Sequence, residues 1–189
     1  MRIRQLTFIP GVLALFLAEI ACTINIGGPA YPNPSIPVST EAMGDLSSAI
    51  ETEVVNGTVS GQIKISITET QLTSYLSYKI LALPQPFITN PQVYLENGQL
   101  QLYGTATERY IQATVSLVFS AGVDEMGHLM IKLNSANFGP LPVPNGLSEF
   151  ASAAIQEAYT GALGPVATGF RMKSVTIANG SMTIVGQTK

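Results

Sequence analysis

The sequence predicts an α+β domain, a single antiparallel sheet of about seven strands with two or three helices packed on one face. Three observations support this fold class. A hairpin pattern with a central Asn-Gly occurs twice, runs of alternating apolar and polar residues lie around it, and three segments carry apolar residues at helical spacing. Because the connections between neighbouring strands are short, the strands are expected to pair antiparallel.

Residues 1–21 are expected to be an export signal. Arg2 and Arg4 precede an apolar run over 6–18, which is shorter than the roughly 20 residues that a spanning helix needs. Cys22, the only cysteine, lies where a bacterial lipoprotein signal is cut, so it is the expected lipid-attachment residue. Glu19 stands where an aliphatic residue is usual. An uncleaved signal anchor, or an ordinary signal peptide with an incidental cysteine, is the alternative.

The rest of the chain divides into a linker and one domain. Residues 22–40 are rich in proline and glycine and poor in large apolar side chains, which is typical of a semi-extended linker. Residues 41–189 then have the length of one ordinary domain with a sizeable core.

The first two predicted helices flank a strand. Residues 40–55 carry one apolar stripe, Thr40 is the expected cap, and Asn56-Gly57 is the expected end. Residues 61–67 alternate as a half-buried strand. Thr68 and Gln71 fit a capping box, and the helix that follows has its apolar stripe at Leu72, Tyr75, Leu76, Ile80 and Leu83.

The repeated hairpin follows, with a longer hairpin and a third helix between its two copies. Asn97-Gly98 and Asn179-Gly180 lie 82 positions apart, and the apolar residues around them keep the same register. Such a turn needs positive φ at both central residues, so Leu95 is expected opposite Leu100 and Ile177 opposite Met182. Between the copies, 110–120 and 129–133 alternate as strands, and 145–159 has helical spacing.

Composition and motifs favour a function without catalysis. Nine Lys and Arg stand against 12 Asp and Glu, a formal net charge of −3, and the basic residues are scattered, so no nucleic-acid partner is expected. His128 is the only histidine, and with one cysteine in the chain a His/Cys metal set is not expected. Asp124 and Glu125 lie in the same turn as His128, where a solvated loop is the simpler explanation. We therefore expect no enzyme, no cofactor and no metal.

Four segments carry a family resemblance: 67–76, the first Asn-Gly hairpin at 93–104, the Gly-Pro-Leu-Pro-Val-Pro stretch at 139–144, and the closing hairpin. Together they resemble the LmeA-like and YpmS-like groups of small bacterial envelope proteins. Those groups are thought to be related to the tubular lipid-binding (TULIP-like) fold, in which a curved antiparallel sheet packs against a long helix beside an apolar groove. The resemblance implies a curved sheet and the binding of lipid or another apolar ligand. It transfers no catalytic residue.

The sequence thus leads to two expected functions. The first is a protein tethered through Cys22 to the extracytoplasmic face of the bacterial cell membrane, with secretion or a signal anchor as the alternative locations. It would bind its ligand in a groove between sheet and helices. The second is a non-catalytic structural or protein-interaction domain with a closed core, whose protein partner the sequence does not identify. The groove candidates are apolar residues of the predicted helices, strands and connections: Tyr75, Leu76, Ile80, Leu83, Phe87, Phe119, Phe138, Phe150 and Tyr159.

Overall fold

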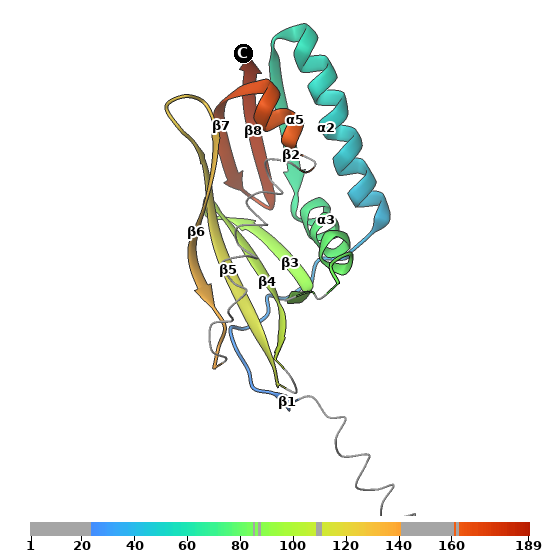
Figure 1. Cartoon of the computed structure of the whole chain (residues 1–189), viewed down its shortest axis with the longest axis vertical. Coiled ribbons are helices and arrows are strands. Elements are labelled where there is room, and N and C mark those ends of the chain that lie inside the picture. The colour runs from blue at the N-terminus through green and yellow to red at the C-terminus, as the bar shows by residue number, and fades with distance from the viewer. Residues whose placement is uncertain (1–23, 85, 87, 109–110, 141–160, 162) are drawn as a thin grey trace, which may run out of the picture.

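The structure, a computed structural model, describes residues 24–84, 86, 88–108, 111–140, 161 and 163–189. These residues form two sheets and three helices, and the longest axis of the molecule is vertical in Figure 1. The lower sheet, sheet A, contains four antiparallel strands: β3 (Ile88–Glu96), β4 (Gln99–Glu108), β5 (Ile111–Val123) and β6 (Leu129–Asn137). The upper sheet, sheet B, contains three: β2 (Gln62–Thr68), β8 (Ser181–Thr188) and β7 (Phe170–Ala178).

The α+β class and the seven antiparallel strands are confirmed, but the single sheet is wrong. Sheet B has the order β2-β8-β7, and sheet A runs from β3 through β4 to β5, with β6 on the far edge of β5. A strand of two residues, β1 (Ile24–Asn25), adds to the same edge of β5 in parallel. Sheet A does not continue past β3 because helix α3 (Glu69–Leu81) occupies that edge. Thr73 Oγ1 and Glu69 Oε1 accept the hydrogen bonds of Val93 N and Leu95 N, at 3.0 and 2.7 Å.

Helix α2 (Thr40–Ser60) is longer than the sequence indicates. Its N-cap is Ser39, whose side-chain oxygen accepts a hydrogen bond from Ala42 N. Gly61, at φ +76°, is the left-handed residue that ends it. Gly57, the expected end, lies inside the helix, where α2 crosses β2: a Cβ added there would lie 2.0 Å from Ile63 Cγ2 and 2.9 Å from the Phe170 ring. The glycine is therefore required by close packing.

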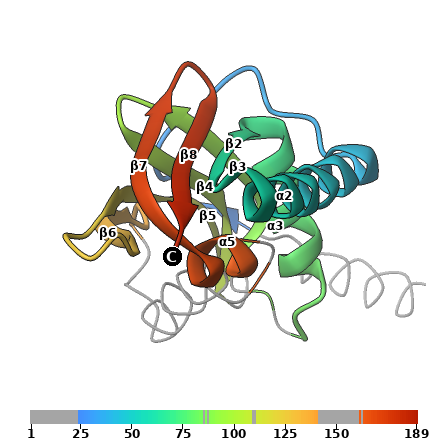
Figure 2. The same cartoon turned by 90° about the horizontal axis from the view of Figure 1, so that it is seen from above.

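Helix α3 begins as predicted, with the complete capping box of Thr68 and Gln71. Seen from above, α2 and α3 lie together on one side of the strands and β6 lies on the other (Figure 2). The third described helix, α5 (Gly164–Gly169), is one and a half turns long and precedes β7. The helix expected over 145–159 lies outside the described residues.

The two Asn-Gly hairpins confirm the sequence prediction and meet each other. All four turn residues have positive φ, and Leu95 pairs with Leu100 as Ile177 pairs with Met182. Gly98 N donates to Ile177 O and Gly180 N donates to Leu95 O, both at 3.1 Å. These bonds join equivalent positions of the repeat, so the two copies are related by an approximate twofold axis between their turns.

The core lies between the inner faces of the two sheets and the helices. The inward residues of sheet A are almost fully buried, as are the isoleucines of β2, which alternate with exposed polar residues. One cluster joins both sheets to α2 and α5 through residues such as Leu46, Ile50, Val115, Val166 and Phe170. The two sheets therefore share a single hydrophobic core.

Candidate functional site

The sequence predicts that helix α3 buries an apolar stripe, but three of its buried side chains carry hydroxyl groups. Thr73 and Ser74 are fully buried and Ser77 nearly so. Thr73 caps the edge of β3, and Ser74 Oγ accepts a hydrogen bond from Ser39 N at 3.1 Å. Ser77 donates to the carbonyl of Thr73 at 2.8 Å. The backbone N–H groups of Val93 and Ser39 need hydrogen-bond acceptors, and α3 is rotated about its axis so that Thr73 and Ser74 supply them. The sequence analysis missed these buried hydroxyls, although Ser77 lies four residues after Thr73 and three after Ser74, spacings that place it on the same face as each of them.

Apart from the buried Ile80, the larger apolar side chains of α3 and of the residues just after it are less buried than these hydroxyls. Leu72, Tyr75 and Leu76 are half-buried and pack against the core. Leu81 and Leu83 are 73% and 47% exposed. Lys79 Nζ lies 5.5 Å from the centre of the Tyr75 ring, a cation–π arrangement that covers part of that ring. Leu72, Tyr75 and Leu76 share one side of α3, whereas Leu81 and Leu83 lie at and just beyond its C-terminal end. These five residues, which we call the exposed apolar residues of α3 and its C-terminal end, are the candidates for ligand binding.

The groove candidates separate into three sets. Ile80, Phe119 and Phe138 are at most 5% exposed, and the two phenylalanines belong to the shared core. Tyr75 and Leu76 are half-buried on α3, and Leu83 is exposed just beyond its C-terminal end. The other three, together with the expected lipid-attachment residue, lie outside the described residues: Cys22, Phe87, Phe150 and Tyr159.

The segment expected to be a linker contacts the sheet along most of its described length. We call residues 24–39 the N-terminal strap. After β1, Ile26 N donates to Gln112 O and Thr114 N donates to Gly27 O, both at 2.9 Å. Further along, Ile36 exchanges two hydrogen bonds with the side chain of Gln92. The strap thus extends the hydrogen bonding of β5 and then crosses to β3.

Three tyrosines fix the middle of the strap. The Tyr31 hydroxyl donates to Asn90 O, and the Tyr94 hydroxyl lies 3.2 Å from Pro34 O. The Tyr103 ring lies between them, with its centre 6.2 Å from Tyr31 and 5.8 Å from Tyr94. Burial, with a smaller contribution from Tyr94, raises the pKa of Tyr31 to about 12. Burial, then Glu69 and Tyr103, raises the pKa of Tyr94 as well. Both hydroxyls are therefore neutral hydrogen-bond donors over the physiological range.

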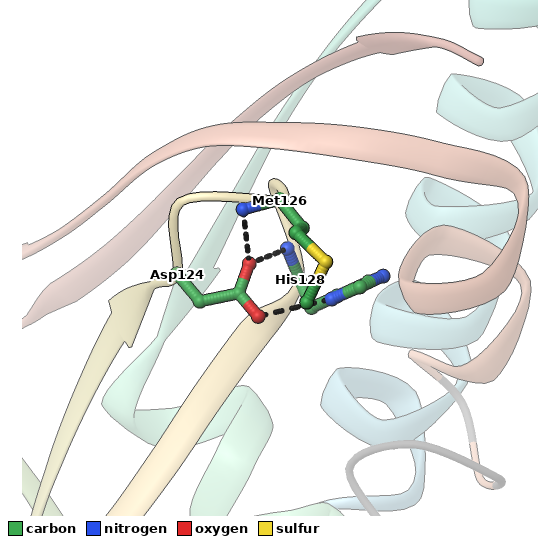
Figure 3. Close-up of polar contacts among 3 residues, drawn as sticks. All are labelled: Asp124, Met126 and His128. Carbon is green, nitrogen blue, oxygen red and sulfur yellow. Dashed lines mark hydrogen bonds and ion pairs between the residues drawn. The ribbon is translucent and has the colours of Figure 1, made fainter.

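The turn around His128 is a folded loop (Figure 3). Asp124 Oδ1 accepts the backbone N–H groups of Met126 and His128, at 2.9 and 2.7 Å, while Oδ2 lies 3.0 Å from His128 Nδ1. The hydrogen bond from His128 N is the main cause that lowers the pKa of Asp124, and the His128 side chain adds to it. The contacts of Asp124 organise the turn itself, and Gly127 O accepts a hydrogen bond from Met172 N of β7 at 2.8 Å. This arrangement fits a structural role for the Asp–His pair.

Two further observations concern metal ligands and membrane-spanning helices. In the part of the chain that the structure describes, no three His, Cys, Asp or Glu side chains group closely enough to hold a metal ion. No helix of that part is long and apolar enough to cross a bilayer.

The chain matches no protein-family model and no curated protein. The resemblance to the LmeA-like and YpmS-like groups stays a prediction.

Proposed function

We propose that this chain is a non-catalytic envelope protein, anchored through a lipid on Cys22 to the extracytoplasmic face of a bacterial cell membrane, that binds lipid or another apolar ligand. The ligand contacts the C-terminal end of α3 at Leu81 and Leu83. One observation carries this proposal. Helix α3 buries Thr73, Ser74 and Ser77 but leaves Leu81 and Leu83 exposed. Covering these two exposed leucines with an apolar molecule is favourable, because it removes apolar surface from water.

A second function has an observation in its favour. Ile80, Phe119 and Phe138 are at most 5% exposed, so these residues already have the burial of a closed core. A structural or protein-interaction domain would use them in this way. It would act through its polar surface and need no ligand.

Ligand binding is tested with a double substitution, Leu81→Gln with Leu83→Gln. Full burial of a leucine contributes about 1.5–3 kcal/mol, so we expect the variant to bind an apolar fluorescent probe at least about tenfold more weakly. It should also lose the lipid that mass spectrometry detects with the wild-type chain purified from membranes. Both leucines are exposed, so the fold should be unaffected.

The matched control replaces exposed apolar residues of α2. Val55 and Val59 are 64% and 89% exposed, and Val55→Gln with Val59→Gln should leave probe and lipid binding unchanged. Equal losses in both variants would mean that exposed apolar surface in general binds the probe. No lipid with the wild-type chain, and no difference in probe binding, would favour the closed interaction domain.

The anchor is tested separately with Cys22→Ser. Each buried methylene contributes about 0.8 kcal/mol, so a dual acyl anchor holds a protein stably on a bilayer. We expect the substitution to move the protein from the membrane fraction to the soluble or secreted fraction. The wild-type amino-terminal peptide should carry the acyl mass. Unchanged fractionation, together with an unmodified wild-type peptide, would contradict lipidation.

A further inference from the structure

The structure places little free chain between the expected anchor and the folded sheet. Ile24 pairs with Ile111 and Asn25 with Gln112 in the parallel bridge of β1 to β5. Only two residue steps separate Cys22 from Ile24. A fully extended chain spans at most about 3.3–3.6 Å per residue, so these steps reach about 7 Å. The Cα atom of an anchored Cys22 therefore lies within about 7 Å of this bridge, and the bilayer lies close to it.

The chain just after β1 is fixed by close backbone packing. A Cβ added to Gly28 would lie 2.1 Å from Thr114 O, so only glycine allows this approach of the strap to β5. Gly139, after β6, has φ +57°, and a Cβ there would lie 2.6 Å from Gly28 Cα. Three segments distant in sequence thus meet at the β1 end of sheet A. That end cannot pivot on a loose linker, because its linker is part of the fold.

The side chains at this end suit a lipid surface. Ile26 is 37% exposed and Ile111 is 38% exposed. Single exposed apolar residues are common on protein surfaces. We single out these two because they lie beside the expected anchor. Ile111 is the bridge partner of Ile24, and Ile26 is two residues further along the strap.

We propose that the β1 end of sheet A, with Ile26 and Ile111, lies directly against the bilayer. This rests on the membrane attachment in the proposed function. The surface is formed by β1, the start of β5 and the strap up to Gly28. The C-terminal ends of α2 and β8 lie at the opposite end of the domain from β1 (Figure 1). In this arrangement they face away from the membrane. The domain has one orientation on the membrane, instead of moving on a flexible tether.

The chain has no tryptophan, so one introduced tryptophan reports its own environment. Full-length Ile111→Trp and Val59→Trp chains, isolated from membranes, are reconstituted in vesicles with and without brominated phosphatidylcholine, which quenches tryptophan on contact. Val59 lies near the C-terminal end of α2 and is 89% exposed, so it is the matched control. We expect Ile111→Trp to lose most of its emission in brominated vesicles, and Val59→Trp to lose none.

A second variant tests the short connection itself. About 20 Gly and Ser residues inserted between Thr23 and Ile24 have a root-mean-square span of about 25 Å. We expect this insertion to restore the emission of Ile111→Trp. Equal quenching at both positions, no quenching at 111, or quenching that persists after the insertion would overturn the proposal.

The mass of the same samples keeps this test separate from that of the anchor. Quenching at 111 in a chain without acyl groups would support the orientation and refute lipidation, because an uncleaved signal anchor would end at the same place. An acylated chain without quenching at 111 would refute the orientation alone. A chain absent from the membrane fraction would refute both.

Discussion

Replacing Gly57 by alanine is expected to lower the free energy of unfolding by about 1–3 kcal/mol, the usual cost of an overpacked core. The new Cβ would lie 2.0 Å from Ile63 Cγ2, in a region where Ile63 and Phe170 are almost fully buried. Neither side chain has room to move, so α2 must shift away from β2. Urea unfolding followed by circular dichroism measures the change.

Gly44 in the same helix provides the control. It is exposed, and a Cβ added there meets nothing within 4 Å. Gly44→Ala should raise the free energy of unfolding by about 0.5–1 kcal/mol, because alanine is the better helix former. Two alanine substitutions in one helix thus have opposite expected signs. If Gly57→Ala stabilised the protein as Gly44→Ala does, α2 would not pack on β2 at the observed distance.

Replacing Thr73 by valine is expected to cost about 1–3 kcal/mol, because it leaves a buried backbone donor without its partner. Val93 N donates to Thr73 Oγ1 at 3.0 Å, and both residues are fully buried. Valine keeps the shape of threonine, so the cost comes from the hydrogen bond. Urea unfolding measures the stability, and amide hydrogen exchange should show faster exchange at Val93.

Ser77→Ala separates this effect from the loss of any buried hydroxyl. Ser77 donates to Thr73 O, an acceptor that already lies within the helical hydrogen-bond ladder. Its removal leaves no buried backbone group unpaired, and we expect a change within about 0.5 kcal/mol. If Ser77→Ala lowered the free energy of unfolding as much as Thr73→Val, the hydrogen bond from Val93 to Thr73 would contribute no more than any other buried hydroxyl contact.

Sequence patterns predicted correctly those elements that are determined by residues adjacent in the sequence. The capping box at Thr68 and both Asn-Gly hairpins formed as expected, because each depends on a few adjacent residues. The same reasoning was wrong at Asn56-Gly57. There the Asn-Gly pair is helical, and its glycine is required by contact with Ile63 and Phe170. When a residue is required by a neighbour that is distant in sequence, the residues adjacent to it in the sequence do not reveal the requirement.

The division into two sheets could not be predicted from alternation. Alternating residues indicate strands and the partners within a hairpin. The pairing of β2 with β8, in contrast, joins strands that are more than 100 residues apart in the sequence. The end of sheet A depends on two side-chain acceptors of α3, Glu69 and Thr73. Since a carboxylate and a hydroxyl replace a neighbouring strand, strand patterns alone do not show where the ladder stops.

The candidate site was predicted only in part for a related reason. Helical spacing selected Tyr75, Leu76, Ile80 and Leu83 as one stripe, but the structure buries Ile80 and exposes Leu83. Helix rotation follows from backbone donors on β3, which spacing within the helix does not reveal. The composition of the strap likewise indicated a linker. Its contacts through Tyr31, Ile36 and Ser39 depend on residues more than 30 positions away.

The exchanged hydrogen bonds at the two turns bear on how the domain unfolds. Gly98 needs the carbonyl of Ile177, and Gly180 needs that of Leu95, so each hairpin completes the bonding of the other. Opening either sheet alone would break both of these hydrogen bonds and expose the core that the two sheets share. The two sheets are therefore expected to unfold in one cooperative step, although they share no strand. What looks like two small sheets is, thermodynamically, one unit.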